Sequence, residues 1–134
     1  MKRIIGLLAL IFTLCQPLPV TAAADDALPD GFIAIAPDKM NWNDAKAYCA
    51  SKGGRLPLID GKNRLSSVPS GTPVDGFGSV GAKWPSGLPS DNYADYWTGT
   101  EAGVNRGDTW VIGGKIGVGT RDNQSSTTRV VCVP

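Results

Sequence analysis

Histidine is missing from this sequence of 134 residues. It is the side chain whose ordinary pKa lies nearest neutral pH, and it is the commonest metal ligand in proteins. Its absence excludes catalytic triads that depend on an imidazole base and zinc sites built on imidazole ligands. We therefore expect no catalytic residues, no metal site and no cofactor, in a protein that is not an enzyme.

Glutamate is also scarce, and the sequence has no marked excess of positive charge. Glu101 is the one glutamate among the 12 acidic residues. With Lys2 and Arg3 set aside as part of a leader, 11 of the 13 basic residues remain against 12 acidic ones, a formal net charge of −1. Because this balance leaves no basic surface excess, we expect no nucleic-acid partner. The 17 glycines and 10 prolines favour turns over long helices.

The one long apolar run lies at the start of the sequence. Lys2 and Arg3 precede the apolar residues 4–14, a run too short to span a bilayer, and small residues follow it. This pattern is typical of a secretory signal peptide over residues 1–24. No second apolar run approaches transmembrane length. The sequence thus predicts an exported domain over residues 25–134 without a transmembrane segment, in the periplasm, secreted or at the cell surface.

The expected cellular compartment decides how the three cysteines are interpreted. Cys15 lies in the expected leader and suggests a lipid anchor, but Leu14 occupies a place where that signal requires a small residue. The mature chain keeps Cys49 and Cys132. Export to an oxidising compartment predicts a disulfide between them. A catalytic thiol is the alternative, although the sequence offers no histidine to activate it.

Residues 41–53 carry the one clear helix pattern. The side chain of Asn41 can cap the first turn, and Gly53 can adopt the left-handed conformation that ends a helix. Trp42 and Cys49 fall on one face at helical spacing. The helix is therefore expected to present Cys49 toward the protein interior.

Short strands and one long irregular stretch account for the rest of the domain. The predicted strands are residues 32–36, 96–100, 109–112, 115–118 and 128–133. Gly113-Gly114 indicates a tight hairpin between two of them. Residues 60–95 are rich in glycine, proline and serine, with a helical turn predicted at 62–68. Irregular stretches of this length are usually functional or disordered.

Two strand tryptophans are expected in the core. Trp97 and Trp110 are large apolar side chains on predicted strands, which are usually buried. Because side chains alternate along a strand, Tyr96 is expected to face the side opposite Trp97.

The order of these elements, together with several motifs, resembles that of bacterial C-type-lectin-like domains. The first-helix motif reads Trp42-x-Asp44-Ala45-x-x-Tyr48-Cys49-x-x-x-Gly53-Gly54-Arg55-Leu56-Pro57. Later motifs are Trp84-Pro85, Tyr96-Trp97-Thr98-Gly99-Thr100 and Val130-Val131-Cys132-Val133. The resemblance spans about residues 31–134. It implies an α+β fold in which one main helix packs on a short antiparallel sheet, with a long irregular insertion and one disulfide.

Departures from the sugar-binding members of that family are equally informative. Their calcium-dependent Glu-Pro-Asn or Gln-Pro-Asp loop is missing, and Trp42-Asn43-Asp44 opens the helix instead of lying on a late strand. The resemblance therefore implies the compact, calcium-independent type found at the tips of intimin and invasin adhesins. Formylglycine-generating enzymes share the helix motif but need far more chain and a separate cysteine pair, so an enzyme is a remote interpretation.

Lys83, Trp84 and Tyr93 form the preferred candidate contact surface. Aromatic side chains combine a large apolar area with a polar tip, which suits protein or glycan partners. All three lie in the irregular stretch. Burial in the core is the alternative interpretation for the two aromatic residues.

Two further patterns suggest ligands, and each has an alternative interpretation. Arg106-Gly107-Asp108 spells an integrin-binding tripeptide, although a glycine-bearing hairpin turn explains it as well. The oxygen-bearing residues near the later loops fit turn capping better than a calcium site. Those residues are Asp91, Asp95, Asp122 and Asn123.

Together these observations favour non-catalytic binding outside the cytoplasm. The expected partner is a protein or a carbohydrate, in an adhesin-like role. A structural or assembly subunit of an envelope complex or surface appendage is the alternative.

Overall fold

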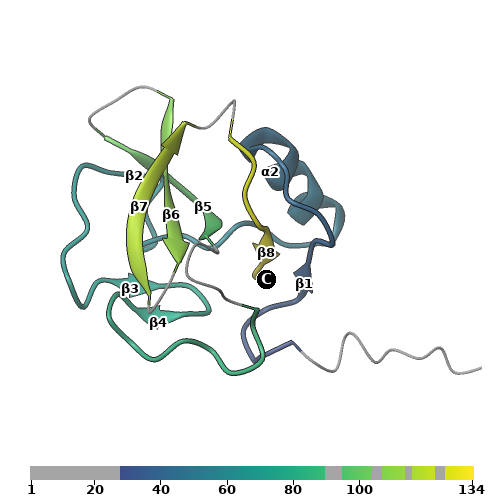
Figure 1. The fold of residues 1–134 in the computed structure, drawn as a ribbon, viewed down its shortest axis with the longest axis horizontal. Coiled ribbons are helices and arrows are strands. Elements are labelled where there is room, and N and C mark those ends of the chain that lie inside the picture. The colour runs from purple at the N-terminus through teal and green to yellow at the C-terminus, as the bar shows by residue number, and fades with distance from the viewer. Residues whose placement is uncertain (1–27, 90–94, 104–106, 114–115, 123–125) are drawn as a thin grey trace, which may run out of the picture.

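The computed structural model describes residues 28–89, 95–103, 107–113, 116–122 and 126–134 (Figure 1). The predicted signal peptide, Tyr93 and Arg106 lie outside the described residues, as do Asp91, Asn123 and the side chains of Asp95 and Asp122.

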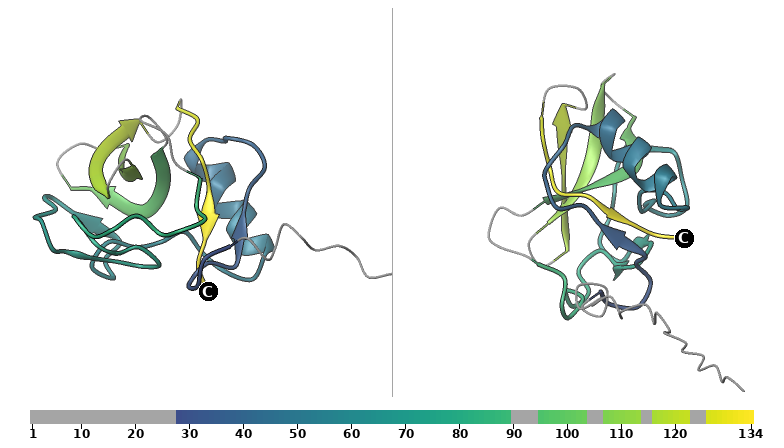
Figure 2. Two further views of the ribbon diagram at one scale, coloured as in Figure 1. Left: turned by 60° about the horizontal axis from the view of Figure 1, so that its bottom comes forward. Right: turned by 90° about the vertical axis from the view of Figure 1, so that its right-hand side faces the viewer.

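The fold is α+β, as predicted, and the described residues form one helix beside short sheets (Figures 1 and 2). The helix is α2 (Trp42–Ser51). The strands are β1 (Ala34–Ile35), β2 (Arg64–Leu65), β3 (Pro73–Val74), β4 (Gly78–Ser79), β5 (Asp95–Ala102), β6 (Asp108–Gly113), β7 (Gly117–Asp122) and β8 (Val131–Cys132). They form a four-stranded sheet in the order β2-β5-β6-β7 and two pairs, β1-β8 and β3-β4. The main sheet is mixed and not wholly antiparallel, because β2 runs parallel to β5.

Helix α2 begins and ends where its local sequence predicts. The side chain of Asn41 accepts the backbone N–H of Asp44 at 2.8 Å, a hydrogen bond that satisfies an otherwise unpaired first-turn donor. Gly53 has a φ of +82°, and the next N–H, that of Gly54, donates to the Cys49 carbonyl at 2.9 Å. Both predicted end signals are confirmed.

Two indole groups fasten the helix to β5. The Nε1–H of Trp42 donates to the Thr98 carbonyl at 2.8 Å. The Nε1–H of Trp97 donates to the Met40 carbonyl, just before the helix, at 2.7 Å. Each side chain thus combines apolar burial with a satisfied polar group. The inward face of the helix is set by these bonds and by the buried Ala45 and Cys49.

Strand β5 is buried on both faces. Trp97 packs with Val111 and the helix residues, whereas Tyr96 packs with Phe77 and Ile112 in a second cluster. Both Tyr96 and Trp97 are fully buried. The predicted opposition of these two side chains is confirmed, and β5 divides the interior into two cores.

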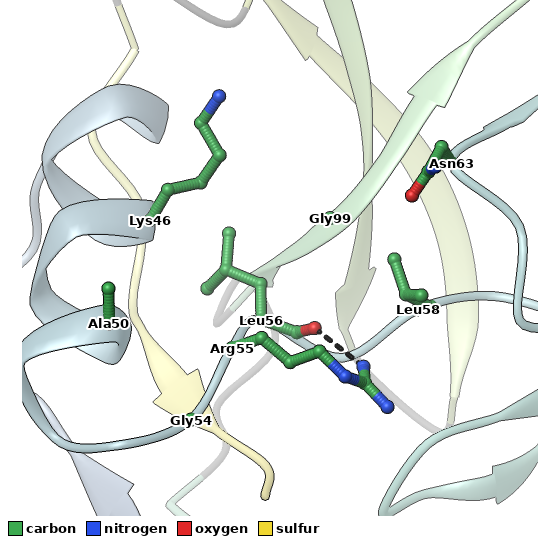
Figure 3. Close-up of a pocket in the computed structure, with 8 residues that line it drawn as sticks. All are labelled: Lys46, Ala50, Gly54, Arg55, Leu56, Leu58, Asn63 and Gly99. Atoms are coloured by element: carbon green, nitrogen blue, oxygen red, sulfur yellow. Dashed lines mark hydrogen bonds between the residues drawn. The ribbon is translucent and has the colours of Figure 1, made fainter.

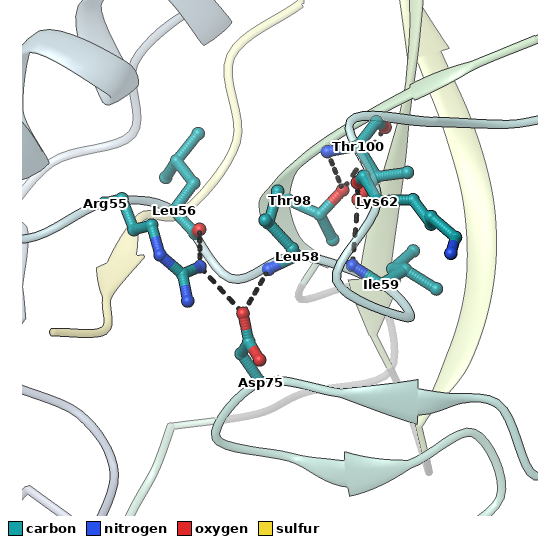
Figure 4. Close-up of polar contacts among 8 residues, drawn as sticks. All are labelled: Arg55, Leu56, Leu58, Ile59, Lys62, Asp75, Thr98 and Thr100. Carbon is teal, nitrogen blue, oxygen red and sulfur yellow. Dashed lines mark hydrogen bonds and ion pairs between the residues drawn. The ribbon is translucent and has the colours of Figure 1, made fainter.

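Strand β5 contains a bulge in its pairing with β6. Trp97 pairs with Val111 and Glu101 pairs with Thr109, so β5 carries extra residues between the two pairs. The hydroxyl of Thr98 donates to the Trp110 carbonyl at 2.8 Å across this gap. Figure 4 shows the same hydroxyl accepting the N–H of Thr100, at 3.1 Å.

The helical turn predicted at residues 62–68 is wrong. Asp60 and Gly61 both have positive φ values, 55° and 65°, and the N–H of Lys62 donates to the Ile59 carbonyl at 2.9 Å. Positive φ at both central residues gives a tight turn of the kind that Asp-Gly favours. The chain leaves this turn extended, and β2 then pairs with β5.

The long irregular segment is fixed by apolar anchors. Val74, Phe77 and Leu88 are buried, and Trp84 is half-buried against them. The rings of Phe32 and Phe77 meet edge to face, with centroids 5.1 Å apart. A segment with little regular structure is thereby held against the sheet, as Figure 1 shows for β3 and β4.

Strands β6 and β7 form the predicted hairpin, but its pairing starts later than expected. Gly113 pairs with Gly117, so residues 114–116 separate the strands and β7 begins two residues after the predicted start. Ile116 is buried with a φ of 58°, a conformation that a β-branched residue rarely adopts. Burial of its side chain offsets that backbone strain.

The predicted disulfide joins Cys49 of α2 to Cys132 of β8, with Cα atoms 5.4 Å apart. Strand β8 also pairs with β1, through Ala34 and Ile35. The bridge therefore holds the first strand, the helix and the last strand together.

Substituting Gly54 by alanine is expected to lower the free energy of unfolding by about 3 kcal/mol, near the upper end for overpacking. An added Cβ would overlap the carbonyl oxygen of Val133 and lie 2.6 Å from Cδ1 of Ile33. Gly53→Ala is the matched control, because its Cβ would meet nothing within 4 Å and only left-handed strain of about 1 kcal/mol applies. Urea denaturation of both variants measures the difference, and equal losses would contradict the close contact.

Candidate functional site

A hollow of about 270 Å³ lies between α2, the segment after it and β5 (Figure 3). Its floor is mainly apolar, with Leu56, Leu58 and Gly99 across the middle. Its remaining lining residues are Lys46, Ala50, Gly54, Arg55 and Asn63. The hollow is open to solvent on one side, since Lys46, Ala50, Arg55 and Asn63 are exposed.

Close backbone packing forms the floor of the hollow. The N–H of Gly99 donates to the Pro57 carbonyl at 2.8 Å, which ties the segment after the helix to β5. A Cβ on Gly99 would lie 3.0 Å from Cδ2 of Leu58. Glycine at this strand position thus allows the two leucines to lie directly on the strand.

Arg55 is held at one side of the hollow by Asp75. Its Nη1 lies 2.7 Å from Oδ2 of Asp75 and also donates to the Leu56 carbonyl at 3.2 Å (Figure 4). The same carboxylate oxygen accepts the N–H of Leu58 at 3.0 Å. Asp75 thereby fixes both the guanidinium and the backbone below it.

Lys46 contributes the second cation of the site. Its Nζ lies 3.7 Å from the centre of the Trp42 ring, one helical turn earlier. A cation over an indole face is attracted by the ring electrons, more weakly at an exposed site. Within the described part of the chain, Lys46 has no carboxylate at ion-pair distance.

Two acidic side chains of the described chain are engaged in ion pairs. Asp75 binds Arg55, and Glu101 lies 3.2 Å from Nη2 of Arg64. Among the described residues, no group of three cysteine, aspartate or glutamate side chains could hold a metal ion. The site therefore presents its charge mainly as exposed cations.

The predicted surface of Lys83, Trp84 and Tyr93 is only partly described. Lys83 is exposed, whereas Trp84 is half-buried, with its ring 5.4 Å from that of Phe77 and 6.0 Å from that of Tyr96. The Nε1–H of Trp84 donates to the Leu88 carbonyl at 2.8 Å. Trp84 thus helps to fix the irregular segment, and its role in binding stays a prediction.

The integrin-type tripeptide falls at the start of β6. Gly107 has a φ of +93° in a turn, and Asp108 is half-buried where it pairs with Asp122. Arg106 lies outside the described residues. Integrin binding through this tripeptide stays a prediction.

Sequence reasoning missed the hollow, although two signals pointed to it. Lys46 follows Trp42 at helical spacing, so its ammonium could be expected over the ring. Gly99 lies inside a predicted strand, where glycine often marks the close approach of another backbone. The pairing of Arg55 with Asp75 has no local signal, because the two residues meet only through the fold.

No helix of the described residues has the length and hydropathy to cross a membrane.

No protein family, curated protein or solved structure matches the chain.

Proposed function

We propose that the protein is an exported, non-catalytic binding module of C-type-lectin-like architecture that recognises a protein or glycan at or beyond the cell envelope. The observation that carries the proposal is the hollow of Figure 3, which is open, mainly apolar and flanked by two exposed cations. Concave apolar sites with a few fixed polar groups are the usual form of a binding site.

The disulfide supports both export and a non-catalytic role. Such bonds persist in oxidising compartments, and the sulfurs of Cys49 and Cys132 are bonded to each other and buried. Neither sulfur is thus available as a nucleophile.

Rigid support of the hollow is further support for binding. Its floor is held by the Gly99–Pro57 hydrogen bond, and its edge by the Arg55–Asp75 ion pair. A preformed surface binds with a smaller ordering cost than a mobile one.

Filling the hollow with Ala50→Leu is expected to abolish capture of the partner by the mature, oxidised domain. Ala50 is exposed on α2 and lines the hollow, so a larger side chain occupies the space and leaves the core untouched. Ala47→Leu is the matched control, because Ala47 is exposed on the same helix but does not line the hollow. The measurement is quantitative capture from envelope and host extracts, together with a glycan array.

Capture that is equal for Ala50→Leu and Ala47→Leu would remove the hollow as the binding site. The same assays repeated with a chelator test the expectation of calcium independence. Binding that disappears with the chelator would contradict it.

A further inference from the structure

The hollow combines aliphatic and cationic chemistry in a small space. Leu56, Leu58 and Gly99 make its floor, and Lys46 and Arg55 bring positive charge to its edges. Figure 3 shows the ammonium and the guanidinium on opposite sides of Leu56. A complementary ligand has an apolar group at its centre and negative charge on both sides of it.

Both cations are able to bind a ligand carboxylate. Lys46 forms no ion pair within the described ranges, where its ammonium faces only the Trp42 ring. Both hydrogen bonds that the side chain of Arg55 makes within those ranges use Nη1. A guanidinium carries five N–H donors, so Nε and Nη2 remain for a carboxylate that shares the side chain with Asp75.

The lining fits a peptide side chain better than a sugar ring. The apolar floor is aliphatic, and Trp42, on the helix that borders the hollow, is 7% exposed as a whole residue and carries the Lys46 ammonium over its ring. Aromatic faces are the surfaces on which a ring could stack, and none is open here among the described residues that line the hollow. An aliphatic side chain fills such a space without needing polar partners.

Added-strand pairing is blocked at this part of β5. The Gly99 N–H already donates to the Pro57 carbonyl, and the Thr98 carbonyl already accepts the Trp42 indole. A peptide here must therefore be recognised through side chains and not through a β-ladder.

We propose that the hollow binds an acidic segment of a partner protein, in which an aliphatic side chain fills the space and flanking carboxylates pair with Lys46 and Arg55. This inference rests on the proposed binding function and names its ligand class. Affinity for a short segment is weak, with a dissociation constant on the order of 1 mM, because the buried area is small. It falls with added salt, because exposed ion pairs are screened.

The probe is the blocked tripeptide acetyl-Glu-Leu-Glu-amide, titrated into the mature, oxidised protein and followed by NMR. The Gly99 amide and the methyl groups of Leu56 and Leu58 are expected to shift in a saturable way. Acetyl-Gln-Leu-Gln-amide, which lacks the charge, and acetyl-Glu-Ser-Glu-amide, which lacks the aliphatic group, are each expected to bind at least threefold more weakly. Equal affinity for all three peptides would overturn the proposal.

Matched variants locate the contact. Lys46→Gln is expected to raise the dissociation constant about threefold, whereas Lys52→Gln leaves it unchanged. Lys52 is an exposed lysine near the end of the same helix, with its ammonium 5.4 Å from the Tyr48 ring centre, but it does not line the hollow. Ala50→Leu is expected to raise the dissociation constant tenfold or more. A similar effect of both lysine substitutions would show non-specific charge attraction and overturn the site.

Failure of this inference is separable from failure of the proposed function. If Ala50→Leu abolishes partner capture but the acidic tripeptide causes no NMR shift in the wild-type protein, the ligand class is wrong and the binding site stands. If neither capture nor the tripeptide responds to Ala50→Leu, the hollow is not a binding site and both proposals fall.

Discussion

Replacing Cys49 and Cys132 together by alanine is expected to lower the free energy of unfolding by ~4–5 kcal/mol. The disulfide closes a loop with a sequence separation of 83, and the chain-entropy model gives a loss of this size when such a loop opens. Alanine is the appropriate replacement, because both positions are fully buried and a serine would add an unsatisfied hydroxyl. Urea denaturation monitored by tryptophan fluorescence measures the change.

The loss is large relative to the stability of a domain this small. Native domains are typically stable by roughly 5–15 kcal/mol, so the variant keeps only a fraction of that margin. Wild-type protein denatured in the presence of a reductant is the control, and its unfolding midpoint is expected to match that of the alanine variant. A double variant within about 1 kcal/mol of the oxidised wild type would contradict the importance of the bridge.

The expected effect is local as well as global. Strand β8 has only Val131 and Cys132 in its pairing with β1, so the ladder alone holds it weakly. The adjoining Val133 exchanges two backbone hydrogen bonds with Arg55, which borders the hollow. Loss of the disulfide is therefore expected to loosen one edge of the proposed binding site first, because short pairings open at low free energy.

Local signals made the helix predictable. The side chain of Asn41 and the conformational freedom of Gly53 act within a few residues of the helix ends. A short stretch of sequence is therefore enough to predict where the helix begins and ends. The burial of Cys49 followed from helical spacing. The disulfide was predicted from an expected oxidising compartment and from the small number of cysteines, and the pairing of Cys49 with Cys132 is confirmed.

Long-range contacts explain what the sequence could not supply. The parallel pairing of β2 with β5 joins Arg64 to Glu101, and no local pattern specifies a parallel partner. The failed prediction of a helical turn has a local cause as well, because the tight turn at Asp60-Gly61 leads the chain into the extended segment that pairs with β5. The hollow depends on three separate segments, and its cations are ordinary surface residues until the fold brings them together.

Truncating Trp97 to alanine is expected to cost ~3–5 kcal/mol of unfolding free energy, the range for removing a buried aromatic side chain. The side chain is fully buried, in the cluster that contains Cys49, Cys132 and Val111. Its loss also leaves the Met40 carbonyl without the indole donor. Urea denaturation measures the cost, with circular dichroism to confirm that the variant still folds.

Two companion variants separate packing from hydrogen bonding. Trp97→Phe keeps most of the buried area but removes the Nε1–H, so it is expected to cost less, about 1–3 kcal/mol. Trp110→Ala removes the same side chain from a half-buried position on β6 and is expected to cost less than Trp97→Ala. If Trp110→Ala proved the more costly, the contact between helix and β5 would not be the stabilising centre of the fold. The hollow beside that contact would then lose the rigid support from which its binding role is argued.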